Sequence, residues 1–380
     1  MTTLFITSKS LGGSGKYISS LAKGIKSHTN CEILYYPSKV SQDAEIEKEF
    51  SFSHHFSKIP CFNPIKLLKN ILQVRKILNN GNYVAVHTHT SLGGFIGRIG
   101  AFISSRPIKK IHTIHAYGAD EFTPVPQKWV YWVIERGLDL ITDCYISPSQ
   151  YMIEYGSRNH IITRSKANVI YNSLPLKTPG VERITQRKTV REAMGLLEDE
   201  TLFLFCGRLE KQKGVDVLFD AIAKMDDRIS FKVALCGEGD LRNELNEQAN
   251  RLGIQHRLHW LGWQSEVSQF YAAADIYIMP SRWESFGLVF LEAMNYEMPI
   301  LSTKTQAIPE VVEDQVCGLL SDNEDSSQLA NNMAIFLNDK KLATEMGMKG
   351  KIRLNSMFTF NTFIQSHMVI YEKMGIKIKH

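Results

Sequence analysis

Short apolar runs rich in β-branched and aromatic residues alternate with longer amphipathic stretches along almost the whole chain, and this alternation constrains the fold most. In the first half the expected strands are residues 4–8, 31–37, 83–89, 110–116, 143–149 and 167–172. Amphipathic stretches at 15–28, 64–79 and 127–139 are expected to form helices between them. Strands that alternate with helices predict a parallel sheet covered by helices on both faces.

The alternation stops at residues 173–198, which hold two prolines and many charges, and then resumes. The later expected strands are residues 201–207, 231–237, 258–262, 275–281, 299–303 and 318–321. A chain of 380 residues also suits two domains better than one. We therefore predict an α/β protein with two Rossmann-like domains, 1–172 and 199–357, that face each other across a cleft. Residues 173–198 would be a linker, and 358–380 a C-terminal helix that packs back on the first domain.

Open parallel sheets bind ligands at the carboxyl ends of their strands, so chemistry is expected directly after strands. A glycine-rich segment, Ser10–Tyr17, follows the first expected strand. It fits neither the P-loop of nucleotide hydrolases nor the G-x-G-x-x-G fingerprint of dinucleotide-binding proteins. The amide of Gly13 could still approach a phosphate or a sugar, because glycine allows close contact with the backbone.

Two pairs of histidines, His87 with His89 and His112 with His115, lie at strand ends. No Asp or Glu closely flanks either pair to complete a ligand set, so we expect no metal there. We expect His115 to be a polar group that points into the cleft. His89 is equally compatible with a hydrogen-bonded histidine of the core.

Two cations follow the strand at 201–207 in the segment C-G-R-L-E-K-Q-K-G, Cys206–Gly214. Arg208 and Lys213 are five residues apart across a turn, so both could reach one diphosphate. A guanidinium and an ammonium group suit the stabilisation of a leaving phosphate. The alternative is that both are surface residues.

A longer segment, Pro280–Met294, places Glu284 in a loop after a strand and Glu292 two turns along the following helix. The expected helix begins at Ser285-Phe286-Gly287. Its first amides, near Phe286 to Leu288, would be unpaired donors at the positive end of the helix and could bind a diphosphate. The two carboxylates would suit the hydroxyl groups of a sugar and a ribose.

The segment E-S-F-G-L-V-F-L-E resembles the E-x7-E motif of retaining GT-B glycosyltransferases of the large family four group. Other segments resemble the same family in the expected order: Gly12-Gly13, H-T-H-T-S-L-G-G-F-I-G-R, V-I-Y-N-S, G-R-L-E-K-Q-K-G, G-E-G-D, W-L-G and A-I-P-E-V-V. Two positions depart from its pattern. Gln306-Ala307 replaces two glycines near the donor pocket, and Asn172-Ser173 replaces N-G.

The resemblance implies that Arg208 and Lys213 bind the donor diphosphate, Glu284 the hydroxyls of the transferred sugar and Glu292 the ribose. His115 would lie beside the sugar. Amides around Gly13, Ser285, Phe286, Gly287 and Leu288 would complete the pocket, and the base would lie against the segments that contain Gly237 and Leu261.

The implied reaction is the transfer of a sugar, with retention of configuration, from a nucleotide-diphosphate sugar to a hydroxyl of a saccharide acceptor. Protein cations can neutralise the leaving group, so no cofactor and no divalent metal are expected. The alternatives are a sugar-nucleotide epimerase of the same fold and a non-catalytic subunit that binds nucleotide sugars. We expect no nucleic-acid partner, because no known nucleic-acid-binding module is visible.

The charge distribution is the only hint about the acceptor. Residues 1–172 carry 20 Lys and Arg against 11 Asp and Glu, whereas the remainder carries 24 against 28. We expect Ile65, Leu68, Leu72 and Ile77 of helix 64–79 to pack on the sheet. The alternative is that this helix, with Lys66, Lys69, Arg75 and Lys76, docks on an anionic membrane near a lipid-linked saccharide. The resemblance links such enzymes to bacterial surface polysaccharides.

The location of the protein is expected to be cytoplasmic, with the inner face of the plasma membrane as the place of such docking. The N-terminal sequence lacks the features of a signal peptide, and no apolar run approaches the roughly 20 residues that span a bilayer. Six scattered cysteines without a C-x-x-C pair are typical of reduced thiols in a cytosol.

Overall fold

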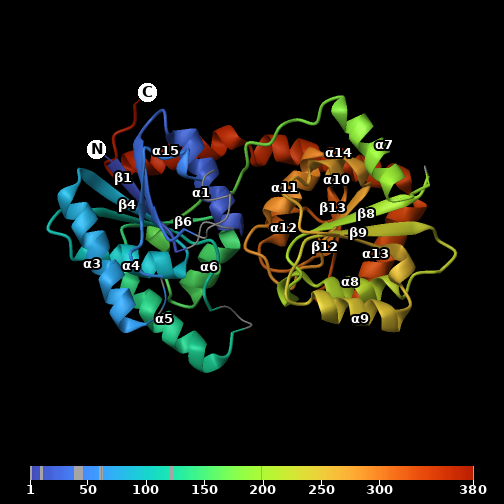
Figure 1. Cartoon of the computed structure of the whole chain (residues 1–380), viewed down its shortest axis with the longest axis horizontal. Helices are drawn as coiled ribbons and strands as arrows, with labels where there is room; N and C mark the ends of the chain where they lie inside the picture. Colours follow the sequence, from blue (N-terminus) through green and yellow to red (C-terminus); the bar gives the residue numbers. More distant parts are fainter. Residues whose placement is uncertain are drawn as a thin grey trace. The chain divides into compact units, whose positions relative to one another are not determined.

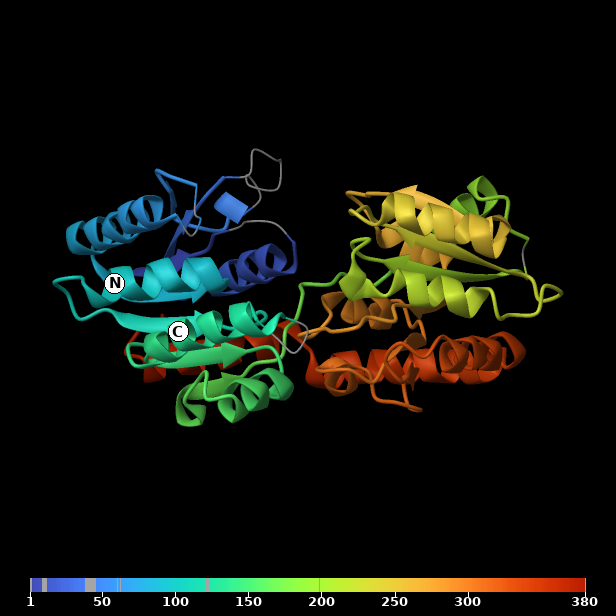
Figure 2. The ribbon, with the colours of Figure 1, turned by 90° about the horizontal axis from the view of Figure 1, so that it is seen from below.

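The computed structural model describes residues 2–8, 12–37, 46–59, 61, 63–119, 123–197 and 199–379. The chain forms two compact units, Met1–Pro175 together with Phe360–His380, and Leu176–Thr359. Each unit contains one parallel sheet with helices on both of its faces (Figures 1 and 2). The predicted α/β fold with two parallel sheets is confirmed.

The first sheet has the strand order β3-β2-β1-β4-β5-β6-β7. Its strands are β1 (Thr2–Ile6), β2 (Asn30–Tyr35), β3 (Phe52–His55), β4 (Tyr83–His89), β5 (Lys109–Thr113), β6 (Cys144–Ser147) and β7 (Ala167–Val169). Its helices are α1 (Gly12–Ile25), α3 (Pro64–Asn80), α4 (Ser91–Phe102), α5 (Val125–Asp139), α6 (Gln150–Arg158) and α15 (Phe360–Lys373), with a 3-10 turn at Arg164–Lys166. The winding direction changes between the neighbouring strands β1 and β4, which is where such sheets bind ligands.

The C-terminal helix α15 packs on the first unit, as predicted. Phe363, Ile370 and Tyr371 share a buried apolar cluster with Tyr17 and Ile18 of α1. In Figure 1, α1 and α15 lie on one side of the first sheet, and α3, α4 and α5 lie on the other. The last helix of the chain therefore completes the core of the first unit.

The second sheet has the strand order β10-β9-β8-β11-β12-β13. Its strands are β8 (Thr201–Cys206), β9 (Phe231–Cys236), β10 (Leu258–Gly262), β11 (Ile276–Ile278), β12 (Ile300–Thr303) and β13 (Gly318–Ser321). Its helices are α7 (Glu182–Ala193), α8 (Val215–Ile222), α9 (Arg242–Leu252), α10 (Ser268–Ala273), α11 (Leu288–Asn295), α12 (Ile308–Val311), α13 (Ser326–Asn338) and α14 (Lys340–Met357), with 3-10 turns at Lys211–Lys213 and Gln255–Arg257. Here the winding direction changes between β8 and β11.

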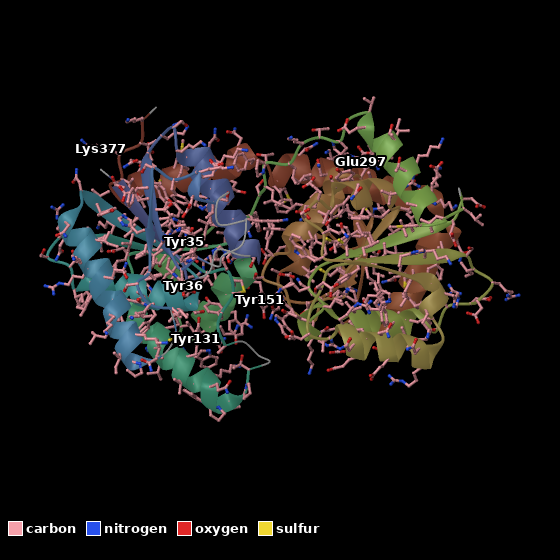
Figure 3. The ribbon with its side chains drawn as sticks, in the orientation of Figure 1. Tyr35, Tyr36, Tyr131, Tyr151, Glu297 and Lys377 are labelled. Carbon is pink, nitrogen blue, oxygen red and sulfur yellow. The ribbon has the colours of Figure 1, made fainter. Side chains whose placement is uncertain are left out.

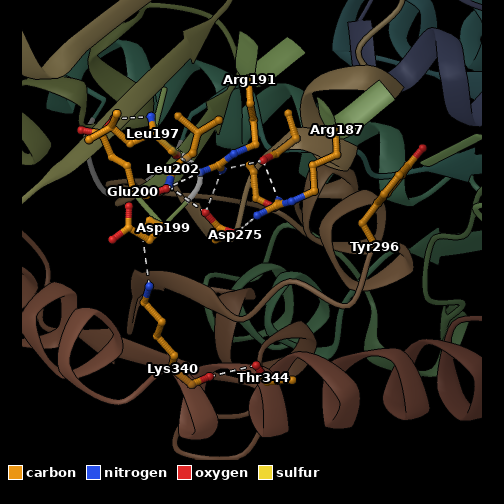
Figure 4. A network of polar contacts seen from close by, with 12 residues as sticks. Arg187, Arg191, Leu197, Asp199, Glu200, Leu202, Asp275, Tyr296, Lys340 and Thr344 are labelled. Atoms are coloured by element: carbon orange, nitrogen blue, oxygen red, sulfur yellow. Dashed lines mark hydrogen bonds and ion pairs between the residues drawn. The ribbon is translucent and has the colours of Figure 1, made fainter. Parts of the chain in front are cut away.

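The stretch expected to be a linker, 173–198, contains α7, which packs against α10 of the second unit. Figure 4 shows the polar contacts that hold it: Arg187 Nη2 lies 2.5 Å from Asp275 Oδ1, and Arg191 Nη1 lies 3.2 Å from Asp275 Oδ2. The same carboxylate accepts a hydrogen bond from the amide of Leu202 on β8. The division between the two units falls after Pro175.

Two details of the first unit differ from expectation. Strand β3 was not predicted; it is four residues long, lies at the sheet edge and exposes Phe52, so its sequence lacks the buried pattern of the other strands. The expectation that Ile65, Leu68 and Leu72 pack on the sheet is wrong, because they are 68%, 56% and 44% exposed.

Helix α3 carries two apolar stripes with the same spacing, and the structure buries the other one. Ile71, Val74 and Leu78 are at most 7% exposed and belong to a core cluster with residues of β1 and β4, and Ile77 packs partly buried against that cluster. Spacing alone cannot tell which of two equivalent stripes faces the sheet.

Candidate active site

The closest contact between predicted site residues joins Lys213 and Glu284. Lys213 ends the 3-10 turn that follows β8, and Glu284 lies in the loop between β11 and α11. The Lys213 Nζ lies 2.5 Å from Glu284 Oε2, and the two side chains are 15% and 10% exposed. A largely buried ion pair therefore lies where the second sheet changes winding direction.

Arg282 joins the two loops that carry this ion pair. Its guanidinium donates to both carboxylate oxygens of Asp216 on α8, at 2.8 and 2.6 Å, and to the carbonyl of Lys211 at 2.7 Å. It also pairs with Glu324. Burial alone would raise the pKa of Asp216, but the hydrogen bonds and charge of Arg282 lower it.

Sequence analysis missed Arg282. The available signal was an arginine two residues before Glu284 in the quoted segment, but its partners are distant in the sequence.

The loop around Glu284 is also fixed by the segment after β12. The side-chain oxygen of Gln306 accepts a hydrogen bond from the Glu284 amide at 3.1 Å, and the Ala307 amide donates to the Glu284 carbonyl at 3.3 Å. Gln306 was noted as a departure that adds a side chain near the donor pocket. That side chain contacts the backbone of a predicted site residue.

Helix α11 begins at Leu288, directly after Gly287. Gly287 has φ +84°, a backbone conformation that strains any larger residue. A Cβ atom there would also lie 2.5 Å from the ring of Phe290 and clash with it. Phe286 is buried against Phe358, with ring centroids 5.7 Å apart, whereas Ser285 is half-buried. The first amides of an α-helix have no partner within the helix, so this terminus attracts anions.

Glu292 lies on α11, half-buried, and accepts a hydrogen bond from the hydroxyl of Tyr271 at 3.0 Å. Burial raises the pKa of Tyr271 and of Tyr277, and the nearby Cys206 and Glu292 raise both further. Glu284 also raises the pKa of Tyr277. The carboxylates of Glu284 and Glu292 therefore both raise the pKa of the buried Tyr277.

Of the remaining predicted residues of this unit, Arg208 follows β8, Gly237 follows β9 and Leu261 lies near the end of β10. Gly237 has φ +146°, and a Cβ atom there would lie 1.9 Å from the Gly207 carbonyl oxygen, so the two strand ends approach closely. Leu261 lies in β10, and its carbonyl accepts from Gln264 at 2.7 Å. Arg208 does not join Lys213: its side chain is 68% exposed and lies 2.5 Å from Glu210.

In the first unit, His115 follows β5 and is half-buried. Its Nε2 lies 3.1 Å from Nδ1 of His89, and its ring meets the ring of Tyr17 edge-on with centroids 4.8 Å apart. Burial lowers the pKa of His115 to about 4, so its imidazole is neutral near pH 7. His89 is fully buried in the core.

Gly13 lies in the exposed first turn of α1, and the preceding Ser10 and Leu11 lie outside the described residues.

Metal ligands and membrane-spanning helices were sought in the same parts of the chain. Within the described ranges, no three His, Cys, Asp or Glu side chains are grouped so that they could hold a metal ion. Within those ranges, no helix combines the length and apolar character needed to cross a membrane.

Comparison with known families gives two matches that together cover most of the chain. Residues 11–177 match Glycosyltransferase Family 4, and residues 186–353 match Glycosyl transferases group 1. A 41.2 kDa protein from the cps region of Klebsiella pneumoniae is 30% identical over 378 residues, which cover 96% of this chain and 99% of that protein.

A second relative has a named activity, the UDP-Gal:alpha-D-GlcNAc-diphosphoundecaprenol alpha-1,3-galactosyltransferase of Escherichia coli. It is 27% identical over 73% of this chain and 72% of its own length. Among solved structures, HepE of Anabaena in complex with UDP and glucose superposes with a TM-score of 0.83 at 21% identity, covering 97% of this chain and 99% of HepE. The chain is thus similar to glycosyltransferases in both sequence and fold.

Proposed function

The chain belongs to the group 1 glycosyl transferases, which have the two-domain GT-B fold, and from this premise we propose the reaction it performs. The reaction is transfer of a sugar from a nucleotide-diphosphate sugar to a hydroxyl of a saccharide acceptor, with retention of configuration. The Klebsiella relative from a cps region and the Escherichia coli galactosyltransferase support a role in surface polysaccharide synthesis. The name of the Escherichia coli enzyme includes a GlcNAc-diphosphoundecaprenol, which is a lipid-linked saccharide, and this supports a lipid-linked acceptor for the present chain.

The observation that carries this proposal is the buried pair of Lys213 and Glu284 beside the first turn of α11. Lys213 supplies a cation, and the helix terminus supplies amides, so together they suit a diphosphate. Glu284 suits the hydroxyl groups of the transferred sugar, and Glu292 suits the ribose. Arg208 is assigned to the diphosphate, because its exposed side chain can exchange Glu210 for a phosphate.

The proposed chemistry is electrostatic. As the bond between the anomeric carbon and the diphosphate breaks, negative charge grows on the leaving phosphate, and Lys213, Arg208 and the helix terminus stabilise it. The acceptor hydroxyl attacks from the face that the phosphate leaves, and the phosphate takes its proton. Protein cations perform this stabilisation, so no divalent metal is assigned a role. His115 is assigned as a neutral polar contact to the sugar, and Gly237 and Leu261 as contacts to the base.

The test is transfer measured with a panel of labelled nucleotide sugars and saccharide acceptors in wild type and three variants. Glu284→Gln and Lys213→Ala are expected to lower kcat by roughly 100- to 1000-fold. Lys211→Ala is the matched control: its side chain is an exposed cation in the same turn, and turnover should stay near wild type. Wild-type turnover in Lys213→Ala would refute the site assignment.

The same assay separates the alternatives by product. A sugar-nucleotide epimerase would convert the donor without an acceptor, and a non-catalytic subunit would bind the donor and release it unchanged. Formation of a labelled glycoside excludes both.

We also propose that the first unit docks on an anionic membrane, where a lipid-linked acceptor would be found. Helix α3 exposes Ile65, Leu68 and Leu72, and its sequence holds four basic and no acidic residues. Exposed apolar residues among basic ones are typical of helices that lie in a membrane interface.

Helix α5 supports the same proposal, because it exposes several large apolar residues and buries two acidic ones. Its buried residues are Glu135, Leu138 and Asp139, whereas Val125, Trp129, Val130 and Val133 are each more than 60% exposed. Polar contacts attach it to the unit: Arg98 donates to both oxygens of Glu135, and the hydroxyl of Tyr131 lies 3.3 Å from that of Ser91 (Tyr131 is labelled in Figure 3). Both α3 and α5 pack beside α4.

Binding to vesicles of phosphatidylglycerol or phosphatidylcholine, at low and high salt, tests the docking surface. Binding should require phosphatidylglycerol and weaken with salt. Trp129→Ser and Leu68→Gln should each weaken partitioning by roughly 10- to 100-fold, since burying such a side chain contributes about 1.5–3 kcal/mol. Ile352→Gln, which changes an exposed isoleucine of the second unit, is the control. Equal weakening by the control would contradict the assignment of the surface.

A further inference from the structure

Two cysteines end neighbouring strands of the second sheet. Cys206 is the last residue of β8, Cys236 is the last residue of β9, and the two are direct partners in the parallel register. Paired residues of a parallel sheet point to the same face, so the two thiols are neighbours and each shifts the pKa of the other. Cys206 is half-buried, and Cys236 is 3% exposed.

The backbone at this position is compatible with a covalent bond between the two sulfurs. Neighbouring strands lie about 4.8 Å apart, and disulfides connect Cα atoms that are about 4.4–6.8 Å apart. The strand ends are also held together beyond the cysteines, because the Gly207 amide donates to the Cys236 carbonyl at 3.0 Å. The thiols can therefore meet without a large rearrangement of the sheet.

The thiol pair is connected to a residue of the proposed donor site. The Tyr271 side chain interacts electrostatically with Cys206, and its hydroxyl donates to Glu292 Oε2 at 3.0 Å. Gly207 and Gly237, which follow the two cysteines, begin the segments assigned to the diphosphate and the base. A change in the bonding of the two sulfurs would therefore affect Glu292, the carboxylate assigned to the ribose, and the ends of β8 and β9.

We propose that Cys206 and Cys236 form a reversible oxidation site, at which a low-molecular-weight disulfide closes them into one disulfide and weakens nucleotide binding. The effect on nucleotide binding rests on the proposed function, whereas the closure of the disulfide does not. Drawing Cys206 toward Cys236 changes the surroundings of Tyr271, which is the hydrogen-bond partner of Glu292.

The oxidation proceeds as two thiol–disulfide exchanges. Cys206 is the more exposed of the two thiols; after it loses its proton to solvent, its thiolate attacks one sulfur of the small disulfide and expels the other as a thiolate, which leaves a mixed disulfide on Cys206. Cys236, as thiolate, then attacks the Cys206 sulfur and expels the second small thiolate. Two cysteine thiols lose two electrons and two protons, and the small disulfide is reduced to two thiols.

Position and acidity both favour this pair over the other cysteines. The contact with Cys206 lowers the pKa of Cys236, which favours the thiolate needed for the second exchange, whereas the same contact and burial raise the pKa of Cys206. Burial raises the pKa of Cys31, Cys144 and Cys317. Cys61 is half-buried in the first unit and serves as the control.

The experiment treats the full chain with oxidised glutathione and follows it by intact and peptide mass spectrometry. The expected product has lost two hydrogens and contains a peptide in which Cys206 is linked to Cys236, and dithiothreitol restores the starting mass. Cys206→Ser and Cys236→Ser should each prevent the cross-link, whereas Cys61→Ser should form it as wild type does.

Binding of UDP and of GDP to reduced and oxidised protein is measured in parallel by calorimetry. Oxidation is expected to weaken the binding of the nucleotide that the reduced protein prefers by at least about tenfold, reversibly with dithiothreitol. Absence of the cross-link, or unchanged binding by cross-linked protein, would overturn the proposal. If the reduced protein binds neither nucleotide but the cross-link forms, the proposed function fails instead, and the oxidation site stands without its link to the donor.

Discussion

Acid should unfold the first unit, because its core contains histidines that stay neutral in the folded state at pH values where the unfolded chain protonates them. His367 of α15 is fully buried, its Nδ1 lies 2.8 Å from the Phe363 carbonyl, and its Nε2 lies 2.6 Å from the Tyr17 hydroxyl. The carbonyl can only accept, so Nδ1 donates and Nε2 accepts from Tyr17. Burial penalises the charged imidazolium and lowers the pKa of His367 to about 4, against the opposing effect of the hydrogen bond to the Phe363 carbonyl.

The magnitude follows from linkage between protonation and folding. Because the folded pKa lies below the unfolded one, the unfolded chain binds the extra proton, so the free energy of unfolding rises with pH between them. The stabilisation is complete above pH 6.5 and is lost as the pH falls toward 4. The step from 6.5 to about 4 for His367 corresponds to about 3 kcal/mol, at about 1.4 kcal/mol per pH unit. Burial likewise lowers the pKa of His87, His89, His112 and His115.

Together, protonation of these histidines should offset a free energy of unfolding of about 5–15 kcal/mol within one to two pH units below 6.5. Hydrogen exchange followed by mass spectrometry, corrected for the intrinsic rate at each pH, can assign the loss to peptides of β4, β5 and α15. His367→Gln should be less stable than wild type at pH 7 but should depend less steeply on pH. Phe363→Leu, a substitution in the same cluster, should lose stability and keep the wild-type pH dependence. Full protection of these peptides at pH 4.5 would refute the reasoning.

Three other perturbations test the site and the core. Arg98→Met should lower the free energy of unfolding by about 3–5 kcal/mol in urea titrations, because it leaves the buried Glu135 unpaired, and adding Glu135→Leu should recover much of the loss. The Arg282→Lys variant lacks the planar guanidinium that binds the carboxylates of Asp216 and Glu324, so the KM for the donor should rise with little change in the thermal midpoint. An unchanged KM would exclude a positioning role for Arg282. Turnover should persist after dialysis against EDTA, and a loss that Mg²⁺ or Mn²⁺ restores would refute the metal-independent mechanism.

The parallel sheets and the neighbourhood of the site could be predicted from sequence because both depend on local patterns. Alternation of apolar runs with amphipathic stretches predicted β4, β10 and β13 with their observed bounds. Loops that follow parallel strands meet at one sheet edge, so the order of motifs was enough to bring the loop of Lys213 to that of Glu284.

The pairing of side chains could not be predicted, because each pair joins residues that are distant in sequence. Arg282 contacts residues 66 and 42 positions away, and nothing in the local pattern distinguishes it from a surface arginine. Arg208 shows the opposite case: a family motif placed it correctly after β8, but its side chain pairs with Glu210, two residues further on, rather than lying beside Lys213. On α3, two stripes of equal spacing left the buried face undecided.

The pairing of Lys213 with Glu284 gives a prediction that neither motif contains. Glu284 is the partner of the Lys213 ammonium, so a free nucleoside diphosphate that binds Lys213 competes with this carboxylate and is repelled by its charge. Glu284→Gln removes this competition, so UDP or GDP should bind more tightly to the variant, while sugar transfer falls because the hydroxyl contacts of Glu284 are weakened. Calorimetry with the nucleoside diphosphate and kinetics with the nucleotide sugar should therefore move in opposite directions. If both binding and transfer fall together, Glu284 acts only by holding Lys213 in place, and its assignment to the sugar is wrong.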